Sequence, residues 1–163
     1  MSDPISDLLG IIRQEIGIYR ELAEHARSKT ALLVQGTVEA ILESNKAEEA
    51  FASKLSALEA EMKRLCQELT QSLRIPREEF TLTRLADNLE QSLAGELRSQ
   101  IILLRNAVKY LKAVSRRNMK IIEKSIHYSR NILALLCNAS GSYRQNGLLE
   151  QLPPIQPVFS QRG

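Results

Sequence analysis

Hydrophobic positions recur at alternating steps of four and three residues through one long segment, from Leu93 to Asn138. The apolar positions on this stripe are Leu97, Ile101, Leu104, Val108 and Leu111, followed after a polar gap by Ile122, Ile132 and Leu136. Such spacing lines one face of an α-helix. We therefore predict a helix of about 46 residues, roughly 69 Å long at 1.5 Å per residue. A helix of that length needs other long helices beside it. It indicates a rod-like bundle that works by offering binding surfaces and not by enclosing a catalytic site.

The same periodicity predicts two further helices, from about Pro4 to Gln35 and from about Val38 to Leu73. Pro4 suits a first helical turn, with Asp3 or Ser2 as the cap. Gly36 and Thr37 are a good helix end and a good helix start, so we expect a tight turn there, with a kinked continuous helix as the alternative. The second helix carries a coiled-coil seam formed by Phe51, Leu55, Leu58, Met62, Leu65 and Leu69. Its polar stretch 43–50 is expected to be poorly packed or exposed.

The remaining segments complete an all-α fold. Pro76 ends the second helix, and residues 76–88 read as a connector with a short helix that carries Leu82, Leu85, Ala86 and Leu89. Ser140 and Gly141 end the long helix. We predict an elongated antiparallel three-helix bundle, or coiled coil, with a short connecting helix. Residues 1–141 form its single domain, and the proline-containing segment 142–163 is a flexible C-terminal tail.

Positive charge is concentrated in the long helix. The chain carries 22 Lys and Arg against 19 Asp and Glu. Between Arg98 and Arg130, nine basic residues accompany a single acidic one, Glu123, whereas residues 1–70 hold eight basic and twelve acidic residues. One interpretation is that the basic helix pairs with acidic neighbours inside the bundle. The other is a docking surface for an acidic partner or for nucleic acid.

Two polar residues, Ser115 and Asn118, interrupt the apolar stripe of the long helix. They are either a buried polar pair that fixes the register of the helices, as Asn does in coiled coils, or positions that face a partner.

The sequence contains no constellation typical of an enzyme. It has no phosphate-binding Gly loop, no G-x-S-x-G, no C-x-x-C and no H-E-x-x-H. His25 and His127 lack the Glu-x-x-His spacing of di-iron bundles and read as helix-surface residues. Cys66 and Cys137 read as buried or half-buried thiols in a reducing cytoplasm. We expect no catalytic residue, no metal and no cofactor, and neither a signal peptide nor a membrane span.

Near its C-terminal end the long helix carries apolar residues on more than one face. These are Ile126, Tyr128, Ile132, Leu133, Leu135 and Leu136. A three-helix bundle buries one stripe of each helix, so the surplus is expected to form an exposed patch that binds a partner. Burial by the tail or by a second copy of the chain is the alternative.

The order and spacing of several segments resemble the FlgN-type flagellar export chaperones of bacteria. The shared features are the opening amphipathic helix, the break at 33–37 with an Ala-Ile-Leu-Glu continuation, the Leu82-Thr83-x-x-Leu-Ala segment, the long helix through Arg117-Asn118-x-x-Ile-Ile, and the ending Tyr143-Arg-Gln-Asn-Gly147. The resemblance covers about residues 5–147. Ser115 departs from it, because a second Asn is expected three residues before Asn118.

The resemblance implies a cytoplasmic, non-enzymatic chaperone that binds hook-associated junction proteins. It would prevent their premature assembly and deliver them to the cytoplasmic domain of the export gate. The client surface carries over to Ile122, Ile126, Ile132, Leu133 and Leu136, and the gate contact to Tyr143. Two other hypotheses stay open: a structural or regulatory coiled-coil dimer with no export client, and a nucleic-acid binder. A homodimer of the client-free chaperone stays open as well. The nucleic-acid binder is disfavoured because the pattern contains no recognised nucleic-acid reading head, so we expect no nucleic acid as partner.

Overall fold

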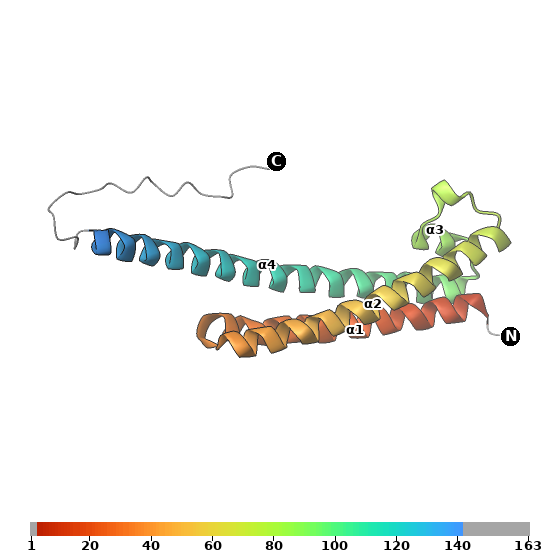
Figure 1. Cartoon of the computed structure of the whole chain (residues 1–163). Helices are drawn as coiled ribbons and strands as arrows, with labels where there is room; N and C mark the ends of the chain where they lie inside the picture. The colour runs from red at the N-terminus through yellow and green to blue at the C-terminus, as the bar shows by residue number, and fades with distance from the viewer. Residues whose placement is uncertain (1–2, 142–163) are drawn as a thin grey trace. The chain divides into compact units, whose positions relative to one another are not determined.

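The computed structural model describes residues 3–141, in which every regular element is a helix. The elements are α1 (Pro4–Gln35), α2 (Val38–Ser72), the short 3₁₀ helix η1 (Arg77–Glu79), α3 (Leu82–Asp87) and α4 (Gln91–Gly141) (Figure 1). The all-α prediction is confirmed, and the predicted helix bounds hold to within two or three residues. The chain divides into two compact units, Met1–Ile121 and the part from Ile122 onwards. The predicted tail, 142–163, lies outside the described residues.

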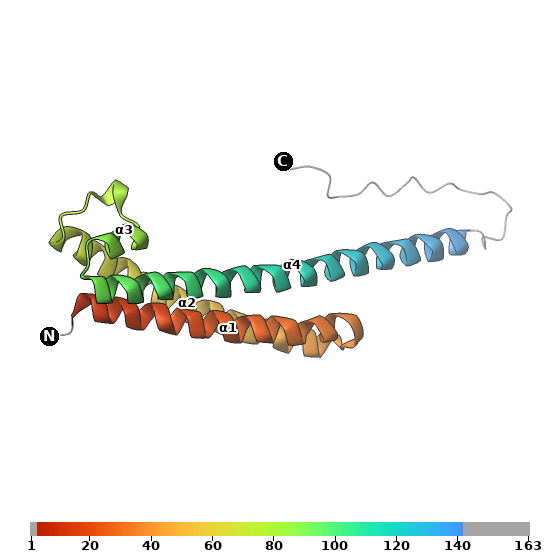
Figure 2. The same cartoon turned by 180° about the vertical axis from the view of Figure 1, so that it is seen from behind.

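In the first unit, α1 and α2 form a closely packed antiparallel hairpin, and the first part of α4 runs beside them in the direction of α1 (Figures 1 and 2). Asp3 caps α1, since its carboxylate accepts a hydrogen bond from the Ile5 amide at 3.2 Å. Thr37 caps α2 in the same way, through the Ala40 amide at 3.2 Å. The break at Gly36 is therefore a turn between two helices, not a kink.

The C-terminal ends of α1 and α2 have backbone conformations that differ from expectation. Gly36 has φ −82°, so it is not in the left-handed conformation that usually explains glycine at a helix end. It is needed for space instead: a Cβ there would lie 2.4 Å from the carbonyl oxygen of Leu32. At the end of α2 the left-handed residue is Arg74, with φ 53°. The amide of Ile75 then donates to the carbonyl of Thr70 at 3.1 Å, which completes a Schellman-type cap.

The apolar core of the first unit lies at one end. The first half of α1, the second half of α2, α3 and the start of α4 meet there. Its buried members are Ile5, Leu8, Leu9, Ile11, Ile12, Ile16, Leu65, Leu69, Leu85, Ala86 and Leu97. The seam residues Leu55, Leu65 and Leu69 are buried as predicted, whereas Phe51, Leu58 and Met62 are half-buried. The short helix α3 thus acts as a fourth wall of the core.

The other end of the hairpin is held by polar contacts. Ser44 is buried, and His25 Nε2 lies 3.0 Å from both its hydroxyl and its carbonyl oxygen. Lys29 donates to Asn45 at 2.6 Å and to Glu48 at 2.7 Å. Four of the eight residues in 43–50 are exposed, as expected. The expectation of poor packing is wrong for Ser44, Asn45 and Glu48, because these residues contact complementary groups on α1. His25 is likewise half-buried and hydrogen-bonded, not a bare surface residue.

Asn118 joins α4 to α1 by two hydrogen bonds. Its amide nitrogen donates to the carbonyl of Ala26 at 2.7 Å, and its amide oxygen accepts from the Thr30 hydroxyl at 2.6 Å. The side chain is buried, whereas Ser115 is exposed. Of the two interpretations of this polar gap, the register-fixing one agrees with the geometry of Asn118. The pairing with Ser115 does not.

Candidate functional site

The second unit exposes a set of large apolar side chains along α4. The exposed fractions are 47% for Ile126, 37% for Ile132, 59% for Leu133, 69% for Leu135 and 61% for Leu136, and Tyr128 is 67% exposed. Ile122 is half-buried. Burial of one such side chain contributes about 1.5–3 kcal/mol, so several of them exposed on one stretch of helix are a strong candidate for binding.

These side chains fall on two different faces of the helix. Ile122, Ile126 and Leu133 follow steps of four and seven and share one face. Tyr128, Ile132 and Leu135 follow steps of four and three and form a second row. A wide apolar surface of this kind fits a partner that lies along the helix, such as an amphipathic helix.

The structure places the predicted site residues as far as it describes them. Ile122, Ile126, Ile132, Leu133 and Leu136 all lie on this stretch of α4, and four of the five are exposed. Tyr128 and Leu135 were left out of the predicted client set, although their spacing with Ile132 is visible in the sequence. Tyr143, the predicted gate contact, lies outside the described residues.

Polar side chains lie beside this surface. His127 is exposed and its ring lies 3.3 Å from the Asn131 amide nitrogen. Cys137 is exposed, contrary to the expectation of a buried thiol, whereas Cys66 is half-buried and its burial raises the pKa of the thiol. Within residues 3–141 no group of three or more His, Cys, Asp or Glu side chains is arranged to hold a metal ion.

Basic side chains along α4 do not pair with the acidic helices beside them. Arg98 contacts Asp87 at 2.6 Å, and Glu96 pairs with Arg13. Beyond these, none of the basic residues from Arg105 to Arg130 forms an ion pair within the described part of the chain. Close ion pairing within the bundle therefore does not hold for this stretch of α4. Five acidic residues of α1 and α2 pair instead with basic residues on those two helices.

The described part of the chain is built from helices, and the last of them, α4, is the longest and exposes large apolar side chains. The protein is therefore in the class of all-α proteins built from long helices. The sequence model of the FlgN family, described as "FlgN protein", matches residues 1–151. The chain thus belongs to the FlgN family, a family of flagellar export chaperones. No curated protein and no solved structure gave a significant match. No helix in the described residues is both long and apolar enough to cross a lipid bilayer.

Proposed function

We propose that this protein is a cytoplasmic chaperone that binds hook-associated junction proteins through the apolar surface of α4 from Ile122 to Leu136. It holds these clients before export, prevents their premature assembly and delivers them to the cytoplasmic domain of the export gate. The observation that carries the proposal is the exposure of Ile126, Ile132 and Leu133 on a helix of a FlgN-family protein.

The chemistry of the surface supports a helical client segment. Junction-protein ends that pair as coiled coils in a filament carry an apolar stripe with the spacing found here. An amphipathic helix laid along α4 would cover that stripe and bury the side chains of both partners. While the client stripe is covered, it is unavailable for assembly, which is how binding would also delay filament growth.

Delivery requires a second contact that leaves the client surface occupied. By its place after the long helix, Tyr143 is the proposed gate contact. Tyrosine combines a large apolar ring with one hydroxyl, and such residues are frequent anchors in small interfaces. The chain needs no catalytic group, metal or cofactor for either step, since both are binding events.

The two-site division is tested with three forms of the full chain and a lysate of a flagellated bacterium. The forms are the unchanged chain, Ile126→Asp with Leu133→Asp, and Tyr143→Ala. Retained proteins are identified by mass spectrometry. The double variant should lose hook-associated proteins and keep the export gate, and Tyr143→Ala should do the reverse. Loss of the same partner by both variants would show that there is one site.

A homodimer is the competing use of the same exposed surface, since a second copy would cover it equally well. Light scattering of the isolated chain separates the two. The chaperone proposal expects a chain whose self-association is dissolved by added client. A tight dimer that ignores hook-associated proteins would instead support a structural coiled coil.

A further inference from the structure

A groove runs along α4 within the first unit. It has a volume of about 580 Å³ and is lined by Ile101, Leu104, Arg105, Val108, Lys109, Lys112, Ala113 and Arg116. All of these residues belong to α4. No residue of α1 or α2 in the described chain lines it, because those helices pack closely on each other and approach α4 less closely.

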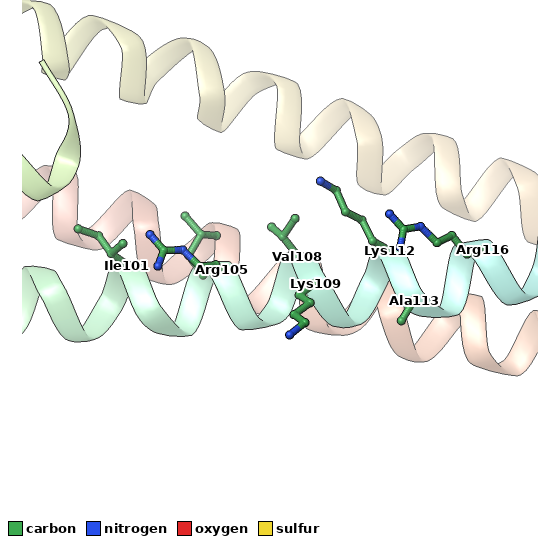
Figure 3. A pocket seen from close by; sticks show the side chains of 8 residues that line it. Ile101, Arg105, Val108, Lys109, Lys112, Ala113 and Arg116 are labelled. Atoms are coloured by element: carbon green, nitrogen blue, oxygen red, sulfur yellow. The ribbon is translucent and has the colours of Figure 1, made fainter. Parts of the chain in front are cut away.

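The groove combines an apolar floor with a basic rim. Ile101, Leu104 and Val108 are half-buried and form the floor. Figure 3 shows Arg105, Lys112 and Arg116 extending on the side of α4 that carries Val108, whereas Lys109 points the other way. These three basic side chains are exposed and have no ion-pair partner among residues 3–141.

Spacing along the groove matches a helix. Ile101, Arg105, Val108, Lys112 and Arg116 are separated by steps of four, three, four and four residues. They therefore form one stripe, about 22 Å long at 1.5 Å per residue. A partner helix of about four turns would span it, with apolar residues on the floor and carboxylates level with the rim.

We propose that this groove binds an acidic amphipathic helix of a partner protein, which completes a local four-helix arrangement in the first unit. The proposal goes beyond the chaperone function above, because it uses neither the apolar surface of the second unit nor Tyr143. The charge of the rim selects Asp and Glu flanks on the partner and rejects Lys and Arg flanks.

Other occupants fit the groove less well. Nucleic acid would use the basic rim, but the floor consists of aliphatic side chains and offers no ring for base stacking. The chain's own residues 142–163 carry two arginines and one glutamate, so they do not supply the negative charge that the rim calls for. A second copy of the chain would have to place its α2 in the groove. Because α2 carries four basic residues beside its seven acidic ones, it matches the basic rim less well than a uniformly acidic helix.

The test uses the full chain and two synthetic helical peptides of about 18 residues. Both peptides carry Leu at alternating steps of four and three, with Glu flanks in one and Lys flanks in the other. Binding is measured by fluorescence anisotropy. The groove variant is Arg105→Glu with Lys112→Glu and Arg116→Glu, and its matched control is Lys120→Glu with Lys124→Glu and Arg130→Glu. Both variants change the net charge equally, and every substituted side chain is exposed.

The Glu-flanked peptide should bind more tightly than the Lys-flanked one, and more weakly as salt rises. The groove variant should weaken this binding by about tenfold or more, and the control by less than about threefold. Val108→Asp should also abolish it, whereas Asn106→Asp, which adds the same charge at an exposed neighbouring position, should not. Far-UV circular dichroism checks that each variant keeps its helices.

Four outcomes would overturn the proposal. The first is that neither peptide binds, and the second is that both bind equally. The third is that the two triple variants weaken binding by the same factor. The fourth is that another occupant depends on the groove: a DNA duplex of about 20 base pairs that the groove variant alone no longer binds, or a dimer that only the groove variant dissociates in sedimentation.

Discussion

Single polar residues inside the first unit set the alignment of its helices. Asn118 is the clearest case, because both ends of its amide are satisfied by α1. With an apolar side chain at this position, α4 could shift by one turn along α1. The two hydrogen bonds of Asn118 form in one register only. Asn118 thus fixes where α4 lies along α1, which bulk apolar contact alone would not.

Replacing Asn118 by Ala should lower the free energy of unfolding by about 1–3 kcal/mol, since the Thr30 hydroxyl and the Ala26 carbonyl each lose one hydrogen bond in a partly buried place. Urea unfolding followed by circular dichroism measures this. Ser115→Ala, one turn earlier and exposed, is the control and should change stability by less than about 0.5 kcal/mol. Equal effects of the two substitutions would contradict the role of Asn118.

Glu15 is a buried carboxylate of α1. One of its oxygens has no hydrogen-bond partner among the described residues. Burial, with a smaller contribution from nearby Glu59, raises the pKa of Glu15 to about 6. Its ordinary pKa is about 4.5, so the folded protein holds this proton more tightly than the unfolded chain does.

Glu15→Gln should therefore stabilise the protein at pH 7, by on the order of 1 kcal/mol after allowance for solvent screening. The sign follows from the raised pKa: the contribution of Glu15 to stability is lost as pH rises from about 4.5 to about 6. The difference in unfolding free energy between the two proteins, measured from pH 4 to pH 7.5, should grow across that window. A difference that does not change with pH would show that Glu15 is not desolvated. Glu21→Gln, at an exposed position of the same helix, should show no such change.

At the scale of whole elements, helix ends are where local chemistry decides the fold. Asp3, Thr37 and Thr81 each cap the helix that follows, and the first two of these caps were predictable from residue type alone. The reason for Gly36 was not, because the sequence suggests a left-handed residue and the structure shows a close approach to the Leu32 carbonyl. Residue type thus predicted where the turn lies but not why it needs glycine.

Gly36→Ala should consequently destabilise the hairpin by about 1–3 kcal/mol, the usual cost of forcing in a methyl group. Gly17→Ala is the matched control: Gly17 lies inside α1 with nothing within 4 Å of an added Cβ. That change should stabilise the protein by about 0.5–1 kcal/mol through helix propensity. Thermal unfolding of both variants tests the contrast, and a stabilised Gly36→Ala protein would refute the steric argument.

Element patterns predicted most of the fold and less of its packing. The apolar period identified all three long helices and the short connector helix, since each buries a stripe at helical spacing. The period could not reveal that stretch 43–50 packs through His25 and Lys29, because a polar residue looks the same whether it faces water or a complementary group. Nor could it reveal which charged residues of α4 would be left unpaired, as that depends on partners distant in sequence.

At the scale of the whole molecule, the chain separates the residues that hold it together from those that it leaves exposed. The apolar core and the polar contacts around His25 and Ser44 lie within the first unit. The unpaired basic residues and most of the large exposed apolar side chains lie on α4. The exposure of the candidate client surface was predictable from the sequence. Excess apolar residues on one helix indicated it, and Ile126, Ile132 and Leu133 are exposed.

The most direct test of the central claim is the affinity of the full chain for a purified hook-associated junction protein, measured by isothermal titration calorimetry. The comparison is between Ile126→Asp with Leu133→Asp, on the apolar surface, and His127→Asp with Asn131→Asp, at exposed polar positions of the same stretch. Both double variants add two negative charges. The account predicts that the first weakens client binding by about a hundredfold or more, since it removes two large apolar contacts, and that the second changes it by less than about threefold. Unchanged affinity in the first variant, or equal loss in both, would contradict the assignment of α4 as the client-binding surface.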